Sequence, residues 1–512
     1  MLARAFSGAV IGIDATLVEV EVDLSIGLPS TATVGLPEAS VKESKERVKA
    51  AVINSGYLFP EDRITVNLAP ADIRKEGTGF DLPIALGILA AIGMVPREAL
   101  DNHLIIGELS LDGRVKPVRG ALPVAVAARD CGKRGVMLSR ENAAEAAVVN
   151  GIEVLPVDNL ADAAEFFRGD KEIAPASIDL NALFDTKRTG SSADFSEVQG
   201  QEHVKRALEV ACAGGHNVIL IGPPGSGKTM LARRLPSVLP PMSFEEALST
   251  TKIYSVAGLL GKGQALVTER PFRSPHHTIS DAGLIGGGRN PRPGEVSLAH
   301  NGVLFLDELP EFKKNVLEVM RQPLEDRFVN LSRAAIAVSY PASFMLVAAM
   351  NPCPCGFLGD TTHQCRCNPR QVAAYRSRVS GPLLDRIDIH VEVPAVAYKE
   401  LAGTGLSEPS EAIRERVAKT RKMGEKRLAG LSIYCNAQMQ NRHLKKFCRT
   451  DQASERLLEQ AVDKLGLSAR GYNRVLKIAR TIADMAGQED ISVRHIAEAI
   501  QYRSLDRNSQ GA

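Results

Sequence analysis

Hydrophobic and polar positions change their period along the chain. Residues 15–22 alternate between apolar and polar side chains, which predicts a strand with one buried face. Residues 40–52 repeat their apolar positions every three or four residues, which predicts an amphipathic helix. Further strands are expected at residues 104–106 and 135–138. Because strands and helices alternate here, we predict an α/β or α+β domain over residues 1–166.

Three apolar runs in the middle of the chain predict strands of a different kind. Val218–Ile221, Val303–Leu306 and Phe344–Met350 are almost continuously apolar, which is typical of parallel strands that are covered on both faces. After about residue 396 the period is helical, most clearly at Glu411–Lys426 and Ala453–Leu465. The sequence therefore predicts a parallel-sheet core followed by helices.

A stretch without periodicity separates the first domain from this core. Residues 167–193 show no regular spacing of apolar positions and end in Thr189-Gly190-Ser191-Ser192, a composition typical of a linker. We find no internal repeat. The predicted order is a first domain at 1–166, a linker at 167–193, a core at 194–395 and a C-terminal helical domain at 396–512.

Composition limits the kinds of partner that the chain can bind. Its 512 residues are 44% hydrophobic and 24% charged, which suits a soluble protein of two or three domains. The formal net charge is only +2, so any surface that binds nucleic acid must be a local patch. The chain has no Trp and only 4% aromatic residues, which favours contacts to phosphates over a platform for base stacking.

Targeting signals and cysteine spacing both favour the cytoplasm. No apolar run has the length of a membrane span, and the apolar stretch after Met1 is broken by Asp14. We therefore expect neither a membrane segment nor a signal peptide. Half of the eight cysteines are scattered, as expected for reduced thiols. These are Cys131, Cys212, Cys435 and Cys448.

The strongest candidate for chemistry directly follows the apolar run 218–221. It is a glycine-rich loop that ends in Lys-Thr and is expected to open a helix. Its members are Gly222, Pro223, Pro224, Gly225, Ser226, Gly227, Lys228 and Thr229. Backbone N–H groups in such a loop bind phosphate, Lys228 is expected to reach the β- and γ-phosphates, and Thr229 to bind Mg²⁺. The predicted cofactors are therefore ATP and Mg²⁺.

The other two core strands also end in polar residues. Asp307 and Glu308 follow one strand, and we expect Asp307 to hold Mg²⁺ and Glu308 to polarise the attacking water. Asn351 follows the other strand and is expected to sense the γ-phosphate or to orient the water. The alternatives are a solvated acidic pair and an asparagine that only opens the turn before Pro352.

Together these motifs resemble those of an AAA+ ATPase. Phe195–Gln201 is similar to the segment on the adenine side, Gly381–Arg386 to the arginine-finger segment, and Ser468–Arg474 to the lid segment, where Arg470 matches the sensor arginine. The resemblance implies that Arg386 acts on the nucleotide of a neighbouring subunit, and hence a ring. The alternative for Arg386 is a salt bridge with a nearby aspartate, Asp385 or Asp388.

Two further segments resemble one branch of that class. Pro271–Thr278 and Met350–Gly356 are similar to the magnesium-chelatase-like AAA+ proteins, and nearly the whole chain resembles the YifB/ComM group within them. The resemblance implies a homo-oligomeric ring, expected to be a hexamer, which acts on single-stranded or branched DNA and drives branch migration in recombination and natural transformation. The alternatives are the motor subunit of a magnesium chelatase and a factor that remodels or scaffolds proteins.

The first domain resembles the proteolytic domain of Lon-type proteases. Arg74–Pro83 and Gly107–Val115 carry this resemblance. That family uses a Ser–Lys dyad, and the matching positions here are Gly79 and Leu122. Since neither side chain can act as nucleophile or base, we expect a Lon-like fold without protease activity.

Four further cysteines are clustered directly after Asn351. Cys353, Cys355, Cys365 and Cys367 form two Cys-x-Cys pairs, and His363 lies between the pairs. Four thiolates could close a tetrahedral, structural Zn²⁺ site, in which His363 could replace one cysteine. The alternative is a reduced or redox-sensitive loop without metal.

Candidates for DNA contact are arginines in two predicted loops. Arg289 and Arg292 lie in the long segment between the two nucleotide motifs, and Arg333 lies near the tip of a hairpin predicted over 328–338. In the AAA+ proteins that this chain resembles, an insert between these motifs projects toward the pore of the ring. Arg289 and Arg292 are chosen because of this resemblance. The alternative is a set of solvated loops.

Overall fold

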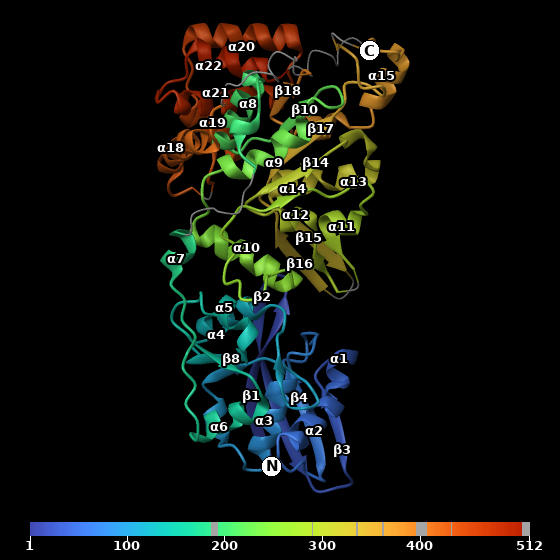
Figure 1. The fold of residues 1–512 in the computed structure, drawn as a ribbon, viewed down its shortest axis with the longest axis vertical. Helices are drawn as coiled ribbons and strands as arrows, with labels where there is room; N and C mark the ends of the chain where they lie inside the picture. The colour runs from blue at the N-terminus through green and yellow to red at the C-terminus, as the bar shows by residue number, and fades with distance from the viewer. Residues whose placement is uncertain are drawn as a thin grey trace. The chain divides into compact units, whose positions relative to one another are not determined.

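The protein folds into two compact units in a computed structural model, which describes residues 1–185, 193–288, 290–333, 336–360, 363–395, 407–431 and 433–503 (Figure 1). The first unit begins at Met1 and continues through α7, and it also takes in Phe244–Thr268 and Ser332–Tyr340. The second unit holds the other described residues. A mixed α/β fold with a parallel core sheet and a helical C-terminal region is confirmed.

The first unit is built on a seven-stranded mixed sheet in the order β3-β4-β2-β1-β5-β8-β9. The neighbours β1, β2 and β4 are antiparallel, whereas β5, β8 and β9 continue the sheet in parallel with β1. The strands are β1 (Leu2–Ile11), β2 (Asp14–Ser25), β3 (Ser30–Val34), β4 (Arg63–Ala69), β5 (His103–Ile105), β8 (Gly135–Ser139) and β9 (Glu153–Val157), with a separate pair of β6 (Glu108–Leu109) and β7 (Val115–Lys116).

The alternation over residues 15–22 is confirmed as part of β2. Val18, Val20 and Val22 are buried on one face of this strand, which packs against α3. The helix predicted over residues 40–52 is interrupted at Glu43, because the chain ends one short helix there and starts another at Ser44. The Ser44 hydroxyl donates to the carbonyl of Val41 at 2.7 Å and so stabilises this break.

Helices of the first unit cover the sheet. They are α1 (Ala39–Lys42), α2 (Ser44–Asn54), α3 (Asp81–Ala91), α4 (Ala121–Asp130), α5 (Ala143–Ala146), α6 (Leu160–Arg168), α7 (Leu180–Asp185) and α10 (Phe244–Ala257), with short 3₁₀ turns at Arg97–Leu100 and Arg140–Asn142. Every residue of α3 is buried, so this helix forms the centre of the first core. Helix α7 lies inside the stretch that the sequence marks as a linker.

The second unit contains a five-stranded sheet in which all neighbouring strands are parallel. Its order is β11-β14-β17-β10-β18, so the strand that leads into the glycine-rich loop lies between β17 and β18. The strands are β10 (Val218–Ile221), β11 (Phe272–Arg273), β14 (Val303–Leu306), β17 (Met345–Met350) and β18 (Ile389–Glu392). Because β10 lies between β17 and β18 in this parallel sheet and strand order reverses there, a crevice for ligands is expected at its carboxyl end.

Shorter elements connect the strands of this sheet. The helices are α8 (Glu202–Gly214), α9 (Lys228–Val238), α11 (Asp281–Ile285), α12 (Glu295–Leu298), α13 (Lys314–Val319), α14 (Arg321–Asp326), α15 (Pro369–Arg376) and α16 (Gly381–Leu384), with 3₁₀ turns at Phe195–Glu197 and Leu309–Glu311. Strands β12 (Gly286–Gly287) and β13 (Arg292–Pro293) form one small hairpin of this unit. Strands β15 (Phe328–Arg333) and β16 (Ile336–Pro341) form a separate two-stranded hairpin, of which Ser332–Tyr340 belong to the first unit, and this confirms the hairpin predicted over 328–338.

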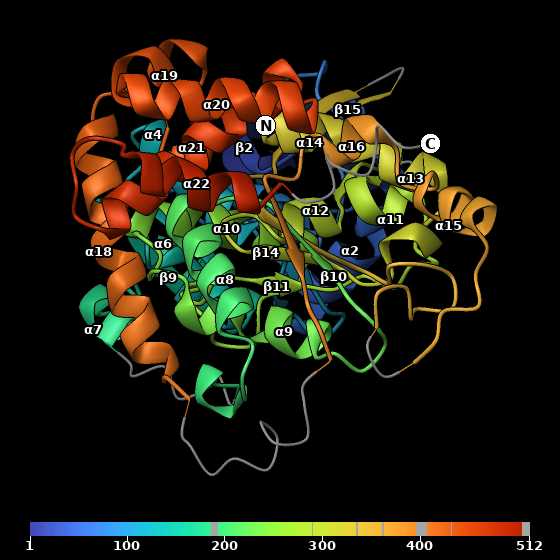
Figure 2. The same ribbon diagram turned by 90° about the horizontal axis from the view of Figure 1, so that it is seen from above.

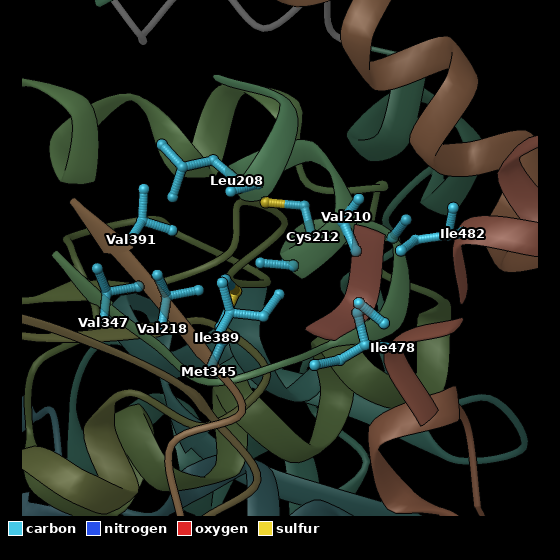
Figure 3. Packing of buried hydrophobic residues seen from close by; sticks show 14 of the residues in the cluster. Leu208, Val210, Cys212, Val218, Met345, Val347, Ile389, Val391, Ile478 and Ile482 are labelled. Carbon is cyan, nitrogen blue, oxygen red and sulfur yellow. The ribbon is translucent and has the colours of Figure 1, made fainter. Parts of the chain in front are cut away.

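The C-terminal helices gather beside α8, as both ribbon views show (Figures 1 and 2). They are α18 (Ser410–Leu428), α19 (Asn441–Phe447), α20 (Gln452–Leu465), α21 (Ala469–Met485) and α22 (Val493–Gln501), with a 3₁₀ turn at Asn436–Gln438. In the close view, Leu208 and Cys212 of α8 lie over the side chains of the sheet, and Ile478 and Ile482 of α21 lie beside Val210 of α8 (Figure 3). One continuous core therefore joins the sheet to the C-terminal helices.

Among the residues that the structure describes, no helix is long and apolar enough to cross a membrane.

Candidate functional site

The glycine-rich loop connects β10 to the first turn of α9, so the amide groups of a helix N-terminus point into the crevice. Gly227 is the N-cap of α9 with φ 87°, a conformation that side chains disfavour. At Gly222 a Cβ atom would lie only 2.1 Å from the carbonyl oxygen of Val393, just after β18. The loop therefore passes so close to the neighbouring chain that glycine is required at this position.

Lys228 is the first residue of α9, and its side chain folds back over the loop. Its Nζ donates to the carbonyl oxygens of Gly222 and Pro223, each at 2.8 Å, and lies 3.3 Å from Oδ1 of Asn351. The residue is 8% exposed, and burial lowers the pKa of its ammonium group, opposed by the charge of Asp307. Among the ion pairs between described residues, Lys228 has no carboxylate partner within 4.0 Å, so an anionic phosphate would supply the missing countercharge.

Thr229 and Asp307 meet across the crevice. The hydroxyl of Thr229 donates to Oδ2 of Asp307 at 2.7 Å, although 78 residues separate them along the chain. A hydroxyl and a carboxylate are oxygen ligands of the kind that Mg²⁺ prefers. The two side chains therefore fit the magnesium ion that accompanies a bound nucleotide.

The carboxylate of Glu308 approaches a histidine. The backbone of Glu308 has φ 51°, and its amide donates to Oδ1 of Asp307 at 2.9 Å. Its carboxylate lies 3.5 Å from Nδ1 of His277, whose ring packs at a tilt of 34° on His276 with 4.1 Å between ring centroids. The contact between His277 and Glu308 was not predicted from the sequence. Strand order is the signal that would have found it, because β11 and β14 are neighbours and both sites follow these strands.

Gln201 links the loop to the end of the segment expected on the adenine side. Its Nε2 donates to the carbonyl oxygens of Ser226 at 2.9 Å and of Pro394 at 3.0 Å. Phe195, at the start of the same segment, is 1% exposed. This segment therefore holds the loop against the chain that follows β18.

Arg386 lies at the opposite edge of the sheet from the glycine-rich loop, because it precedes β18 whereas the loop follows β10. It is buried, with its guanidinium 2.5 Å from Oε1 of Glu325 and 2.5 Å from the carbonyl of Pro382. The ion pair is thus made with Glu325 and not with the neighbouring aspartates that the sequence offered as alternatives.

The two arginines at the start of α21 have different surroundings. Arg470 is exposed in the first turn. Arg474, one turn later, pairs with Asp388 beside the amino end of β18. Burial alone would raise the pKa of Asp388, but the charges of Arg474 and His216 lower it. The structure therefore brings Lys228, Thr229, Asp307 and Asn351 together, and within one chain it leaves Arg386 at the other edge of the sheet.

The four clustered cysteines do converge. Ligand atoms of Cys353, Cys355, Cys365 and Cys367 all lie within 4.8 Å of one another. Backbone hydrogen bonds from Phe357 and then Arg366 lower the pKa of the Cys355 thiol to about 6. His363 is not part of this cluster. Its ring packs at a tilt on Phe357 and approaches the carboxylate of Asp360 at 3.8 Å.

The Lon-like positions in the first unit carry no reactive groups. Leu122 is fully buried in the first turn of α4. Gly79 precedes α3, and a Cβ atom there would lie 3.7 Å from Cγ1 of Val118, an ordinary contact. The described structure thus offers neither a nucleophile nor a base at the two matching positions.

The candidates for DNA contact are only partly described. Arg292 is exposed in β13, and Arg289 lies outside the described residues. Arg333 ends β15, and its side chain lies outside the described part. Two arginines of α18 are engaged in packing contacts, since Arg421 donates to the carbonyl of Cys212 at 2.8 Å and Arg427 pairs with Asp484.

A P-loop between β10 and α9, an Asp-Glu pair after β14 and this strand order define the class of protein, an AAA+ ATPase. Three family models match: "Magnesium chelatase, subunit ChlI" over residues 194–401, "Subunit ChlI of Mg-chelatase" over 20–142, and "Magnesium chelatase, subunit ChlI C-terminal" over 407–503.

Relatives extend this similarity to the whole chain. Competence protein ComM of Haemophilus influenzae is 43% identical over 509 residues, which cover 99% of this chain and 98% of that protein. The uncharacterised protein YifB of Escherichia coli is 42% identical over 507 residues, with the same coverage. Lon protease 2 of Bacillus subtilis is 36% identical over 154 residues, 27% of this chain and 26% of that protein. The chain belongs to the ComM/YifB family of magnesium-chelatase-like AAA+ proteins.

Proposed function

We propose that this chain is an ATP-driven ring motor that moves along single-stranded or branched DNA and promotes branch migration in homologous recombination and natural transformation. The observation that carries the motor is the convergence of Lys228, Thr229, Asp307 and Asn351 at the carboxyl edge of a parallel sheet. The observation that favours DNA is the similarity over the full chain to a protein named for competence.

The proposed roles follow from the contacts in the crevice. Lys228 and the loop amides bind the phosphates, and Lys228 exchanges its carbonyl and Asn351 partners for phosphate oxygens. Thr229 and Asp307 hold Mg²⁺, which neutralises the charge that develops on the phosphates. Glu308 orients the attacking water, and Asn351 senses the γ-phosphate. Each of these groups lies at a strand end or in the first turn of a helix, where the backbone is rigid.

Arg386 cannot serve its own nucleotide if it stays beside Glu325 at the opposite edge of the sheet. We propose that it acts on the nucleotide of a neighbouring copy, in a homo-oligomer that closes as a hexamer. Arg470, exposed in the first turn of α21, is proposed to couple the C-terminal helices to nucleotide state. Hydrolysis would then move the domain at 396–512 against the core at 194–395.

The DNA contacts are proposed at arginines between and after the nucleotide motifs. The exposed side chain of Arg292 supports the first hairpin as one such site. Arg289 and Arg333 complete the proposed set on grounds of sequence alone. Contacts of this kind track phosphates and are weakened by salt.

Zn²⁺ is proposed for the four-cysteine cluster, where protein ligands fill every position and leave none for catalysis. The free thiols Cys212, Cys435 and Cys448 are buried as reduced residues, in keeping with a motor that works in the cytoplasm. The Lon-like domain at 1–166 and the linker at 167–193 are proposed to serve assembly or DNA contact without peptide hydrolysis.

Conversion of a synthetic four-way junction tests this function. Purified protein with ATP and Mg²⁺ should convert the junction to its two duplex products, and Glu308→Gln protein should not. The expected yield falls as salt is raised, because the contacts go to phosphates. Robust ATP hydrolysis without junction conversion, in both low and moderate salt, would contradict the proposal.

The second candidate is the motor subunit of a chelatase, which the three chelatase family models favour. Such a motor should hydrolyse ATP without any response to DNA. The junction assay and the ATPase rate with DNA therefore separate the two functions.

A further inference from the structure

The loop that follows β17 holds the four-cysteine cluster directly beside the nucleotide site. Asn351 follows the last residue of β17, and Cys353 comes two residues later and is fully buried. The Sγ atoms of Cys353, Cys355 and Cys365 are separated by 3.4, 3.7 and 3.6 Å. Four sulfurs around a tetrahedral zinc with bonds of about 2.3 Å would lie about 3.8 Å apart, so these thiols are nearly in place for the ion.

Backbone amides also point at the sulfurs. The amide of Cys355 donates to Sγ of Cys367 at 3.4 Å, and the amide of Cys367 donates to Sγ of Cys365 at 3.5 Å. Such bonds stabilise thiolate over thiol, which is the form that binds a metal. The two Cys-x-Cys turns are therefore folded around their sulfurs rather than extended.

The same turn touches the glycine-rich loop. Gly356 has φ 86°, and its amide donates to the carbonyl of Cys353 at 3.0 Å. A Cβ atom at Gly356 would lie 2.5 Å from Cδ and 2.8 Å from Cγ of Pro224. Only a glycine allows the cysteine turn to approach the phosphate-binding loop this closely. A side chain at this position would push the two loops apart.

We propose that Zn²⁺ bound by the four cysteines clamps the turn at Gly356 against Pro224, so that occupancy of the metal site sets the affinity of the protein for ATP. The inference rests on the zinc and ATP sites proposed above and is independent of any action on DNA. The metal fixes the shape of the turn, the turn limits the positions open to Pro224, and the glycine-rich loop is thereby preorganised for phosphate.

Metal content and nucleotide affinity of the full-length protein provide the test. Wild-type protein purified without chelator should contain about one zinc per chain by mass spectrometry of the metal. The variant C365S/C367S should lose the zinc and bind a fluorescent ATP analogue about ten-fold more weakly, measured without DNA. Cys131→Ser, at an exposed cysteine outside the cluster, is the matched control and should change neither value.

A pair of glycine variants separates the clamp from the metal. Gly356→Ala keeps all four thiols and should retain zinc, yet it should weaken ATP binding because the new Cβ meets Pro224. Gly359→Ala is its control, since Gly359 lies in the same loop with φ 82° and has open space where the Cβ would be. It should keep both zinc and affinity.

Each contrary result overturns a defined part of the inference. Absence of zinc from wild-type protein, with disulfides forming among the four cysteines on mild oxidation, would replace the metal site with a redox loop. Zinc present, but equal ATP affinity in wild type, C365S/C367S and Gly356→Ala, would overturn the clamp. Weaker ATP binding by Gly359→Ala equal to that of Gly356→Ala would assign the effect to backbone strain instead. Failure of junction conversion alone would contradict the proposed action on DNA and would leave the link between zinc and ATP affinity unaffected.

Discussion

Two places in this chain resemble catalytic sites of known families, and their surroundings differ. In the second unit, Lys228 is buried with neutral oxygen partners only, next to Asp307 and Thr229. In the first unit, the buried carboxylate of Asp81 is fully paired, since Arg47 donates to its two oxygens at 2.8 and 3.0 Å. The positions of nucleophile and base there are a glycine and a leucine. A buried cation whose hydrogen-bond partners are neutral oxygens fits a site that binds an anionic ligand, whereas a buried carboxylate that is paired with an arginine fits a structural role.

This difference shows that a fold can persist although the residues that catalyse a reaction are absent from it. The seven-stranded sheet of the first unit has a complete core, with α3 entirely buried, although no reactive group remains at the matching positions. Packing depends on many residues, and catalysis depends on a few, so the few can be lost without the fold.

The largest effect is expected from Arg386→Ala. If Arg386 supplies positive charge to the nucleotide of a neighbouring copy, its loss should lower ATP turnover about 1,000-fold and leave ATP affinity nearly unchanged. Steady-state rates and binding of a fluorescent analogue measure the two quantities. Adding Glu308→Gln protein, which still offers Arg386, should restore part of the activity in mixed rings. Full activity of the single variant would show that the arginine is only the partner of Glu325.

Glu308→Gln should leave ATP binding intact and reduce turnover about 100- to 1,000-fold, because the amide cannot polarise water. Binding and single-turnover hydrolysis, measured on the same preparation, separate the two steps. Glu311→Gln is the matched control, since this exposed carboxylate pairs with Arg378 instead. Normal hydrolysis by Glu308→Gln would contradict the role of Glu308, and the second unit would then lack the catalytic group that sets it apart from the first.

His277→Ala tests the contact that the sequence did not reveal. Without the ring 3.5 Å from its carboxylate, Glu308 loses one orienting partner, and kcat should fall about three- to ten-fold with KM for ATP unchanged. His276→Ala is the comparison, because the Nδ1 of His276 lies 2.9 Å from the hydroxyl of Thr278 instead. A change in KM alone would indicate a structural role for the turn.

The smallest effect is expected from Gly79→Ser, which returns a hydroxyl to the Lon-like position. The added Cβ meets only an ordinary contact at Val118, so stability should stay within about 0.5 kcal/mol of wild type in a thermal melt. With Leu122 still at the position of the base, casein hydrolysis should remain at background. Measurable peptide hydrolysis would mean that the first unit keeps a base elsewhere.

Much of this molecule is predictable from local sequence. The glycine-rich loop, the Asp-Glu pair and the apolar run at 344–350 can be recognised from the sequence because each joins an apolar strand to polar residues over a few positions. The convergence of the four cysteines follows from the short spacing between them. These features involve residues that are close along the chain, or a motif that directly follows an apolar strand.

Other contacts arise only from tertiary packing. The approach of Gly356 to Pro224 and the pair between Arg386 and Glu325 join segments that are far apart in the chain. No periodicity records such contacts, because they depend on which surfaces the folded core brings together.

The central claim is that ATP hydrolysis at the convergent site drives motion on DNA. The most direct measurement is the ATPase rate of purified wild-type protein with no DNA, with single-stranded DNA and with branched DNA, repeated at raised salt. We predict strong stimulation by DNA that fades as salt increases, since the contacts are to phosphates. Appreciable ATPase activity that responds to no DNA at any salt concentration would contradict the account.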